Sequence, residues 1–261
     1  MTADVGVYGG SGLYSLLDDV DEVAVDTPFG PPSAPMTIGE VGGRRVAFLP
    51  RHGRDHSLPP HRVPYRANAW ALRELGVRAV FGPCASGSLD PDVRPGDFVV
   101  IDQLVDRTYG RECTFHDGPG TPAGLAPVDH VSFAEPYDGR LRATAVEACR
   151  SEGVTVHDGG TVVVINGPRF STKAESRWYA AQGWQVVNMT QMPEAVLAAE
   201  AGIPYAAIAL ITDYDVGLEG VPGIEPVTMD EVFAMLERNA EAVRKVLFRA
   251  IGLLPEELFA R

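Results

Sequence analysis

The sequence predicts an α/β fold in which helices cover both faces of a central sheet. Short apolar runs rich in β-formers alternate with helical patterns along most of the chain, as in a layered α/β domain. Several of the strand candidates are continuously apolar, which is typical of strands buried on both faces. With 261 residues, 45% of them hydrophobic, the chain can build one large core, so we expect a single domain over residues 1–261.

The expected elements follow from the spacing of apolar residues. Strands are predicted at Val5–Tyr8, Val46–Leu49, Ala79–Gly82, Phe98–Ile101, Thr161–Ile165, Gln185–Val187 and Tyr205–Ile211. Helices are predicted at Tyr65–Leu75, Leu141–Glu152, Thr172–Gln182, Glu194–Ala201 and Met229–Leu247. Capping boxes at Thr172 with Glu175 and at Thr228 with Glu231 set the start of two of these helices.

Composition narrows the classes of function. A formal net charge of −13 disfavours nucleic acid as a partner, because binding a polyanion requires a basic face. No apolar run approaches the roughly 20 residues that a membrane helix needs, and the N-terminus lacks the pattern of a signal peptide. We therefore expect a cytoplasmic protein without a membrane partner. The three cysteines form no CxxC pair and predict neither a disulfide framework nor a metal site.

Glycines and basic residues follow the first two long strands. GGSG at Gly9–Gly12 lets backbone N–H groups and the Ser11 hydroxyl approach a phosphate, although a plain tight turn explains it as well. It does not match the dinucleotide fingerprint, since Ser15 stands at the third glycine position. The segment RHGRDH then concentrates guanidinium and imidazolium donors, which make charge-assisted hydrogen bonds to phosphate, at Arg51, His52, Arg54 and His56. A solvated basic loop is the alternative.

Two further segments leave strands and carry small or polar residues. In GPCASGSL, the backbone N–H groups of Cys84 and Ala85 are candidates for an anion-binding nest, and a plain loop is equally compatible with the sequence. In VVNMT, the Thr190 hydroxyl either caps the following helix or faces an anion.

The segment LITDYD ends an apolar strand with two carboxylates. Asp213 and Asp215 are two residues apart, which places them on one side of an extended chain. Such a pair can bind a metal, cap a turn or read the edge of a base. Metal is the weakest of the three, because no third carboxylate or histidine lies nearby in sequence.

Taken in order, these segments resemble the methylthioadenosine phosphorylase branch of the trimeric purine nucleoside phosphorylase superfamily. The resemblance runs nearly end to end through GGSGLY, VDTPFGPPS, PRHGRDH, VPYRANAWAL, SGSL, PGDFVVIDQLVDRT, AEPYD, GPRFSTKAES, VVNMTQMPE and ITDYD. It implies a three-layer α/β/α domain with a central mixed β-sheet, a homotrimer, and phosphorolysis of a purine nucleoside without metal or organic cofactor. Inorganic phosphate is then a co-substrate and the nucleoside the other small-molecule partner.

The resemblance also implies roles for individual residues. Those implied to hold phosphate are Ser11, Arg51, His52, Cys84, Ala85 and Thr190. Those implied to contact the nucleoside are Met189 at the ribose and Phe170 and Ser171 at the base. Adenine presents an acceptor at N7 and a donor at N6, so Asp213 is expected to protonate N7 while an ionised Asp215 accepts from the amino group. Cys84 departs from the family, whose members often carry a hydroxyl residue there.

The 5′ side of the nucleoside is implied to lie against the start of the last helix. Met229, Val232 and Phe233 line it with apolar groups, and a histidine matching His130 closes it across a subunit boundary in related enzymes. An apolar 5′ substituent such as methylthio fits best. Phe233 is larger than the aliphatic residue expected from the family.

The expected activity is phosphate-dependent cleavage of 5′-methylthioadenosine or a closely related 5′-substituted adenosine. The alternatives are the same chemistry on adenosine, a 5′-halogenated adenosine or methylthioinosine, a non-catalytic nucleoside-binding module, and a dinucleotide-dependent oxidoreductase. The retained Arg51, His52 and Asp213 disfavour the binding module, and the missing third glycine disfavours the oxidoreductase.

Overall fold

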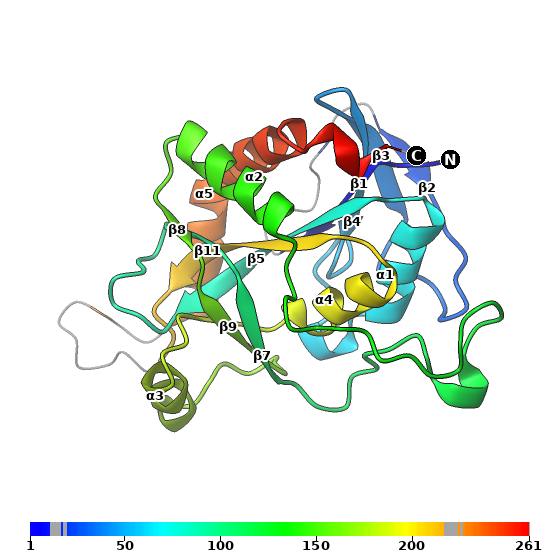
Figure 1. Ribbon diagram of the computed structural model, residues 1–261. Coiled ribbons are helices and arrows are strands. Elements are labelled where there is room, and N and C mark those ends of the chain that lie inside the picture. The colour runs from blue at the N-terminus through cyan, green and yellow to red at the C-terminus, as the bar shows by residue number, and fades with distance from the viewer. Residues whose placement is uncertain (11–16, 18–19, 217–223, 225–226, 261) are drawn as a thin grey trace.

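The computed structural model describes residues 1–10, 17, 20–216, 224 and 227–260, and its strands join in one sheet (Figure 1). The strands are β1 (Val5–Gly9), β2 (Asp21–Val23), β3 (Met36–Val41), β4 (Arg44–Pro50), β5 (Ala79–Ser88), β6 (Phe98–Val100), β7 (Gln103–Arg107), β8 (Val156–Asp158), β9 (Thr161–Ile165), β10 (Val186–Asn188) and β11 (Tyr205–Asp213). The α-helices are α1 (Tyr65–Glu74), α2 (Gly139–Ser151), α3 (Lys173–Ala181), α4 (Gln191–Glu200) and α5 (Met229–Gly252).

The sheet is mixed and branches at β5. Its main path runs β2-β3-β4-β1-β5-β10-β9-β7, while β11 pairs with both β5 and β6, and β6 pairs with β8. Strands β1, β4, β5 and β11 run parallel to their neighbours in this group, whereas β10 meets β5 in antiparallel register. β1 and β10 pair with different parts of one edge of β5, and β11 pairs along the other edge. The candidate site lies at the gap between β1 and β10.

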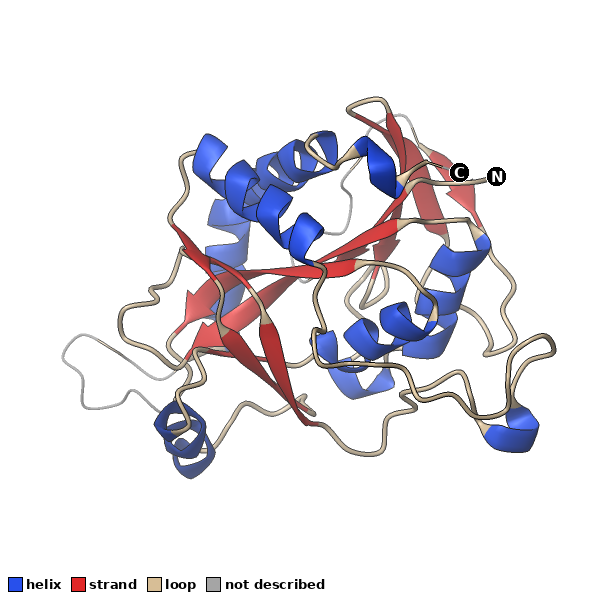
Figure 2. Ribbon diagram, viewed as in Figure 1, coloured by secondary structure: helices blue, strands red, loops and turns tan. Residues whose placement is uncertain are grey.

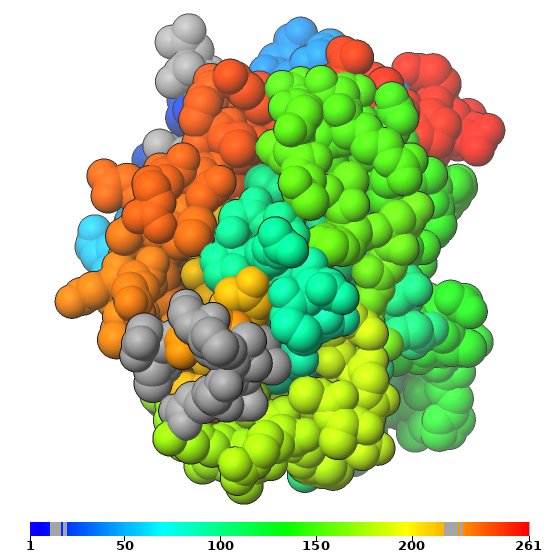
Figure 3. Space-filling model, turned by 90° about the vertical axis from the view of Figure 1, so that its left-hand side faces the viewer, coloured from blue at the N-terminus to red at the C-terminus, as the bar shows by residue number. Residues whose placement is uncertain are grey.

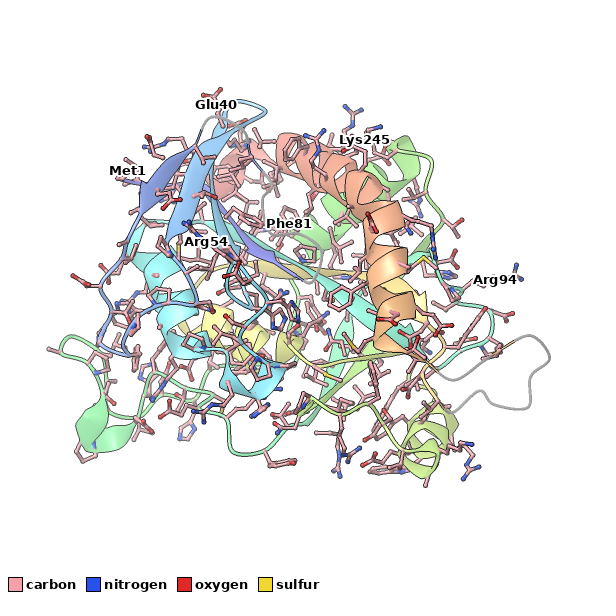
Figure 4. All side chains as sticks on the ribbon, turned by 180° about the vertical axis from the view of Figure 1, so that it is seen from behind. Met1, Glu40, Arg54, Phe81, Arg94 and Lys245 are labelled. Atoms are coloured by element: carbon pink, nitrogen blue, oxygen red, sulfur yellow. The ribbon has the colours of Figure 1, made fainter. Side chains whose placement is uncertain are left out.

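Helices cover both faces of the sheet (Figure 2). Alternate residues of β1 divide between the two layers: Val5 and Val7 join the core under α2 and α5, and Tyr8 joins the core under α1 and α4. Figure 3 shows α2 and α5 side by side on one face of the molecule. In Figure 4, Phe81 of β5 points into the interior and Lys245 points outward from α5. The predicted three-layer α/β/α architecture with a central mixed sheet is confirmed.

The predicted strands and helices all occur, with shifted ends. Both capping boxes form, with the Thr172 and Thr228 hydroxyls each accepting the backbone N–H of the glutamate three residues later. The main correction concerns β5, which continues to Ser88, so GPCASGSL is neither a loop nor a turn-like nest. Its pairing with β11 outweighs the turn-forming composition of the segment.

Four strands were not predicted: β2, β3, β7 and β8. Three of them, β2, β7 and β8, end the pairing paths of the sheet, and their short sequences carry little periodic signal. In the described part of the chain, none of the helices combines the length and apolarity needed to cross a membrane.

Candidate active site

A gap in the pairing of β5 creates the floor of a cavity of about 410 Å³. On one edge of β5, β1 pairs with residues 79–81 and β10 pairs with residues 87–88, so residues 83–86 face the space between them. The Pro83 carbonyl points to this edge, where it accepts a hydrogen bond from Arg51 Nη1 at 3.1 Å. Because backbone groups alternate along a strand, the Ala85 N–H points to the same edge, while the Cys84 N–H points toward β11.

The basic segment after β4 supplies the adjoining wall. Arg51 and His52 line the cavity, and the ring of His56 stacks on that of His52 with centroids 4.6 Å apart. Arg54 is half exposed and pairs instead with Glu22 at 2.7 Å, so it takes no part in the cavity. The basic cluster predicted from RHGRDH thus divides between the cavity and the surface.

His52 is a neutral imidazole, which corrects the expectation of an imidazolium donor. Burial and the neighbouring positive charge of Arg51 lower the pKa of His52 to about 3. Its Nδ1 lies 2.8 Å from the Leu58 carbonyl, which can only accept a hydrogen bond. The proton therefore sits on Nδ1, and Nε2 is left as an acceptor.

Polar groups from β10 and the N-cap residue of α4 also line the cavity. Thr190 is the N-cap of α4, yet its side chain caps no backbone N–H and lines the cavity, which favours the anion-facing alternative. The Cys84 sulfur accepts hydrogen bonds from Asn188 Nδ2 at 3.4 Å and Gln191 Nε2 at 3.2 Å. The thiol that replaces the family's hydroxyl is therefore engaged with side-chain amides.

The two aspartates lie at the end of β11, where the pairing with β5 is irregular. The register shifts between Ile211 and Asp213, a bulge that re-aims the strand end toward the cavity. A Cβ on Gly87 would lie 2.9 Å from Asp213 Oδ1 and 3.4 Å from Asp215 Cβ. Glycine at position 87 therefore provides the space that both carboxylates occupy.

The geometry of the pair differs from an extended chain. Asp213 Oδ1 accepts the Asp215 backbone N–H at 2.7 Å, and Asp215 adopts a left-handed φ of 51°. The turn-capping interpretation is thus correct for Asp213, although both residues also line the cavity. The expected alternation along a strand is wrong for Asp215, because β11 ends at Asp213.

Burial raises the pKa of both carboxyl groups, not of Asp213 alone. The charge of Asp215 raises the pKa of Asp213 further, while hydrogen bonds from Thr212 and from the Asp215 backbone oppose the shift. Asp215 is 3% exposed, and hydrogen bonds from Ser176, Ser171 and the Val216 backbone oppose the rise in its pKa. A buried carboxylate that lines a cavity is suited to accept a hydrogen bond from a ligand.

The start of α5 forms the apolar end of the cavity. Met229 and Val232 line it, and Phe233 lies at its edge with its ring edge-on to His56 at 5.9 Å. Phe233 is 38% exposed and Met229 is 46% exposed in this single chain. This end of the cavity is therefore only partly covered by the described part of its own chain.

Most of the predicted site residues come together. The cavity is lined by Arg51, His52, Cys84, Ala85, Phe170, Met189, Thr190, Asp213, Asp215, Met229 and Val232. Ser171 is buried and His130 lies on an exposed loop, and neither lines the cavity. Ser11 lies outside the described residues.

The sequence interpretation missed several lining residues and one buried partner. Thr212 and Asn188 precede recognised motif residues by one position, so proximity in sequence was the available signal. Glu194 was read only as part of a helix start, yet it forms a buried ion pair with Arg51. Among residues 1–10, 20–216 and 227–260, no three His, Cys, Asp or Glu side chains gather as metal ligands.

Comparisons with known proteins find close similarity over nearly the whole chain. The profile described as Phosphorylase superfamily matches residues 4–252. The chain is 56% identical to an S-methyl-5′-thioadenosine phosphorylase of Mycolicibacterium smegmatis, covering 97% of this chain and 92% of that protein. It is 54% identical to a purine nucleoside phosphorylase of Streptomyces coelicolor, covering 97% and 90%. A methylthioadenosine phosphorylase of Schistosoma mansoni in complex with adenine superposes with a TM-score of 0.90 at 40% identity, covering 97% and 92%.

Proposed function

Because the chain belongs to the phosphorylase superfamily, we propose that it cleaves 5′-methylthioadenosine with inorganic phosphate to give adenine and 5-methylthioribose-1-phosphate. The observation that carries this proposal is the polarity of one cavity. Arg51, His52 and the free edge of β5 line it, and so do the half-buried Asp213 and the buried Asp215. A nucleoside spanning the cavity would place its ribose between phosphate and base.

The reaction exchanges one bond for another at C1′. A phosphate oxygen forms a bond to C1′ as the bond from C1′ to N9 breaks, and the electron pair of that bond passes to the purine. Positioning both reactants in one cavity makes the displacement intramolecular in effect. Arg51 and the Ala85 N–H donate to the phosphate oxygens, the Thr190 hydroxyl adds a third donor, and His52 Nε2 accepts from the protonated oxygen of hydrogen phosphate.

The carboxylate pair acts on the leaving base. Asp213, whose pKa is raised by burial, carries a proton that it donates to N7 as negative charge develops on the purine. An oxygen of the Asp215 carboxylate, which lines the same cavity, accepts from the 6-amino group. A 6-oxo group would point an acceptor at the same oxygen, so the pair favours 6-aminopurines.

The apolar end of the cavity favours a 5′-methylthio group over a hydroxyl. Met229 and Val232 offer aliphatic contact, and burying one methyl group contributes roughly 0.8 kcal/mol. In a Schistosoma mansoni enzyme with a TM-score of 0.88 and 39% identity, methylthioadenosine itself is bound. The metal-free and cofactor-free reaction and the cytoplasmic location stay predictions.

We also propose that the protein is a homotrimer in which His130 of one protomer completes the 5′ side of another. Exposed apolar side chains on the loop that follows β7 support an interface, with Tyr109 76% and Val128 62% exposed. The partly uncovered Met229 and Phe233 are the surface that such a neighbour would cover. Sedimentation equilibrium tests the assembly, and His130→Ala should then raise the KM for methylthioadenosine without changing the KM for phosphate.

The activity is tested by release of free base from a panel of nucleosides with and without phosphate. We expect phosphate-dependent release from 5′-methylthioadenosine with the highest kcat/KM, weaker release from adenosine, and little from inosine or methylthioinosine. The second candidate is a phosphorylase of other purine nucleosides, which the name of the Streptomyces coelicolor relative suggests. A preference for inosine would select that candidate, and absence of phosphate-dependent release from every nucleoside would overturn both.

A further inference from the structure

Arg51 is held from behind by a carboxylate that does not line the cavity. Arg51 and Glu194 of α4 are 1% and 2% exposed. The Arg51 Nε donates to Glu194 Oε1, and Nη2 donates to Oε2 at 3.0 Å, which makes a bidentate pair. With Nη1 bound to the Pro83 carbonyl at 3.1 Å, three of the guanidinium's N–H groups have partners within the protein. The remaining two, one on each terminal nitrogen, are the donors that a ligand can use.

A third residue fixes the carboxylate in turn. The Tyr205 hydroxyl donates to Glu194 Oε2 at 3.1 Å from the first position of β11. To reach it, the phenol crosses Gly82 of the neighbouring strand, where a Cβ would collide with the Tyr205 hydroxyl. Position 82 of β5 therefore has to be glycine. The orientation of Glu194 depends on Gly82 of β5 and Tyr205 of β11 as well as on its own helix.

We propose that Glu194 is the positioning residue of the phosphate subsite, acting through Arg51 and held in place by Tyr205. The carboxylate selects one orientation of the guanidinium, and it balances a charge that would otherwise be buried alone. This inference rests on the proposed function, in which Arg51 binds phosphate. It predicts that Glu194 affects the binding of phosphate and not the binding of the nucleoside.

The test compares Glu194→Gln with a matched control on the same helix. Glu200 is also a partly buried acceptor, taking hydrogen bonds from Thr114 Oγ1 and the Phe115 N–H at 2.7 Å each, but it does not line or support the cavity. We expect Glu194→Gln to raise the KM for phosphate about tenfold or more, the loss expected for a hydrogen bond to a charged group. The KM for the nucleoside should change by less than about twofold. Glu200→Gln should leave the ratio of the two KM values as in the unmodified enzyme.

Two further variants separate positioning from a general loss of folding. Tyr205→Phe removes a single hydrogen bond and should raise the KM for phosphate in the same direction by a smaller factor. In an Arg51→Lys background, Glu194→Gln should add little, because lysine cannot form the bidentate pair through which Glu194 acts. Equal increases in both KM values, or an unchanged KM for phosphate in Glu194→Gln, would overturn the proposal.

Calorimetric titration with inorganic phosphate alone distinguishes this inference from the proposed function. If no nucleoside is cleaved but Glu194→Gln weakens phosphate binding and Glu200→Gln does not, the proposed function fails and the positioning role stands. If the unmodified protein turns over nucleosides and Glu194→Gln binds phosphate equally well, the positioning role fails alone. If the unmodified protein does not bind phosphate, both fail.

Discussion

Asp213 accepts the backbone N–H of Asp215 at 2.7 Å, so the first carboxylate of the pair fixes the turn that carries the second. Asp215 has a left-handed backbone, and its side chain lines the cavity together with that of Asp213. Asp213, the proposed acid, therefore also stabilises the turn. A substitution that tests its acid role must keep the hydrogen bond to the Asp215 N–H and remove only the acidic proton.

Asp213→Asn meets that requirement. The amide oxygen still accepts the Asp215 N–H, but the side chain no longer has an acidic proton for N7. We expect kcat for 5′-methylthioadenosine to fall by about 100-fold to 10,000-fold, as for loss of a general acid. Circular dichroism and the melting temperature should show a retained fold. Near-normal turnover in a folded variant would contradict the role of Asp213.

Asp215→Asn tests the selection of the base. An amide can turn an N–H toward the 6-position, so the preference for an amino group over an oxo group should weaken. The ratio of kcat/KM for 5′-methylthioadenosine to that for methylthioinosine should fall by about tenfold or more, the size expected when a paired polar contact is lost. A variant that loses activity on both nucleosides in equal proportion would argue that Asp215 serves only the turn.

His52 predicts how stability depends on pH. Its pKa is about 3 in the folded protein and 6.5 when unperturbed, so the unfolded chain takes up a proton that the folded one does not. Stability from this group is therefore present above pH 6.5 and is lost as pH falls toward 3. At pH 5.5 the free energy of unfolding should be lower by roughly 1 kcal/mol than at neutral pH. Urea unfolding at pH 7.5 and 5.5 should show this difference for the unmodified chain beyond that for His52→Gln; equal differences would contradict it.

Phe233→Leu tests the apolar end of the cavity. Replacing the ring should admit longer 5′-alkylthio groups, so that kcat/KM for these nucleosides rises relative to methylthioadenosine by about fourfold for each methylene newly buried. Phe248→Leu is the matched control, since Phe248 lies on the same helix, packs under Arg244 and does not line the cavity. An unchanged preference in Phe233→Leu, or the same change in Phe248→Leu, would place the determinant elsewhere.

Much of the fold was predictable because it follows from local patterns. The capping boxes at Thr172 and Thr228 and the apolar run of β11 are written in consecutive residues, and each appears where the pattern indicates. The continuation of β5 through Ser88 was not predictable in this way, because it depends on pairing with β11, more than a hundred residues later.

The candidate site was also predictable only where it depends on local sequence. Individual motif residues such as Thr190 and Met189 could be predicted to meet because ligands collect at strand ends in α/β sheets. The charge of His52 and the partnership of Glu194 with Arg51 could not, since the first depends on burial and the second joins residues 143 positions apart. The motifs were sufficient to predict which residues line the cavity, whereas their charges and ion pairs could be assigned only from the packed structure.

Residues 83–86 of β5 are unpaired on the edge that faces the cavity, and this decides which substitutions the site tolerates. The donor that Ala85 offers to the cavity belongs to the main chain, so exchanging its side chain leaves the donor in place unless proline is introduced. Position 84 lacks this latitude, because its N–H points toward β11 and its thiol accepts hydrogen bonds from amides of β10 and α4. An inhibitor that binds the Ala85 N–H would contact a main-chain donor, and among single substitutions only proline would remove it.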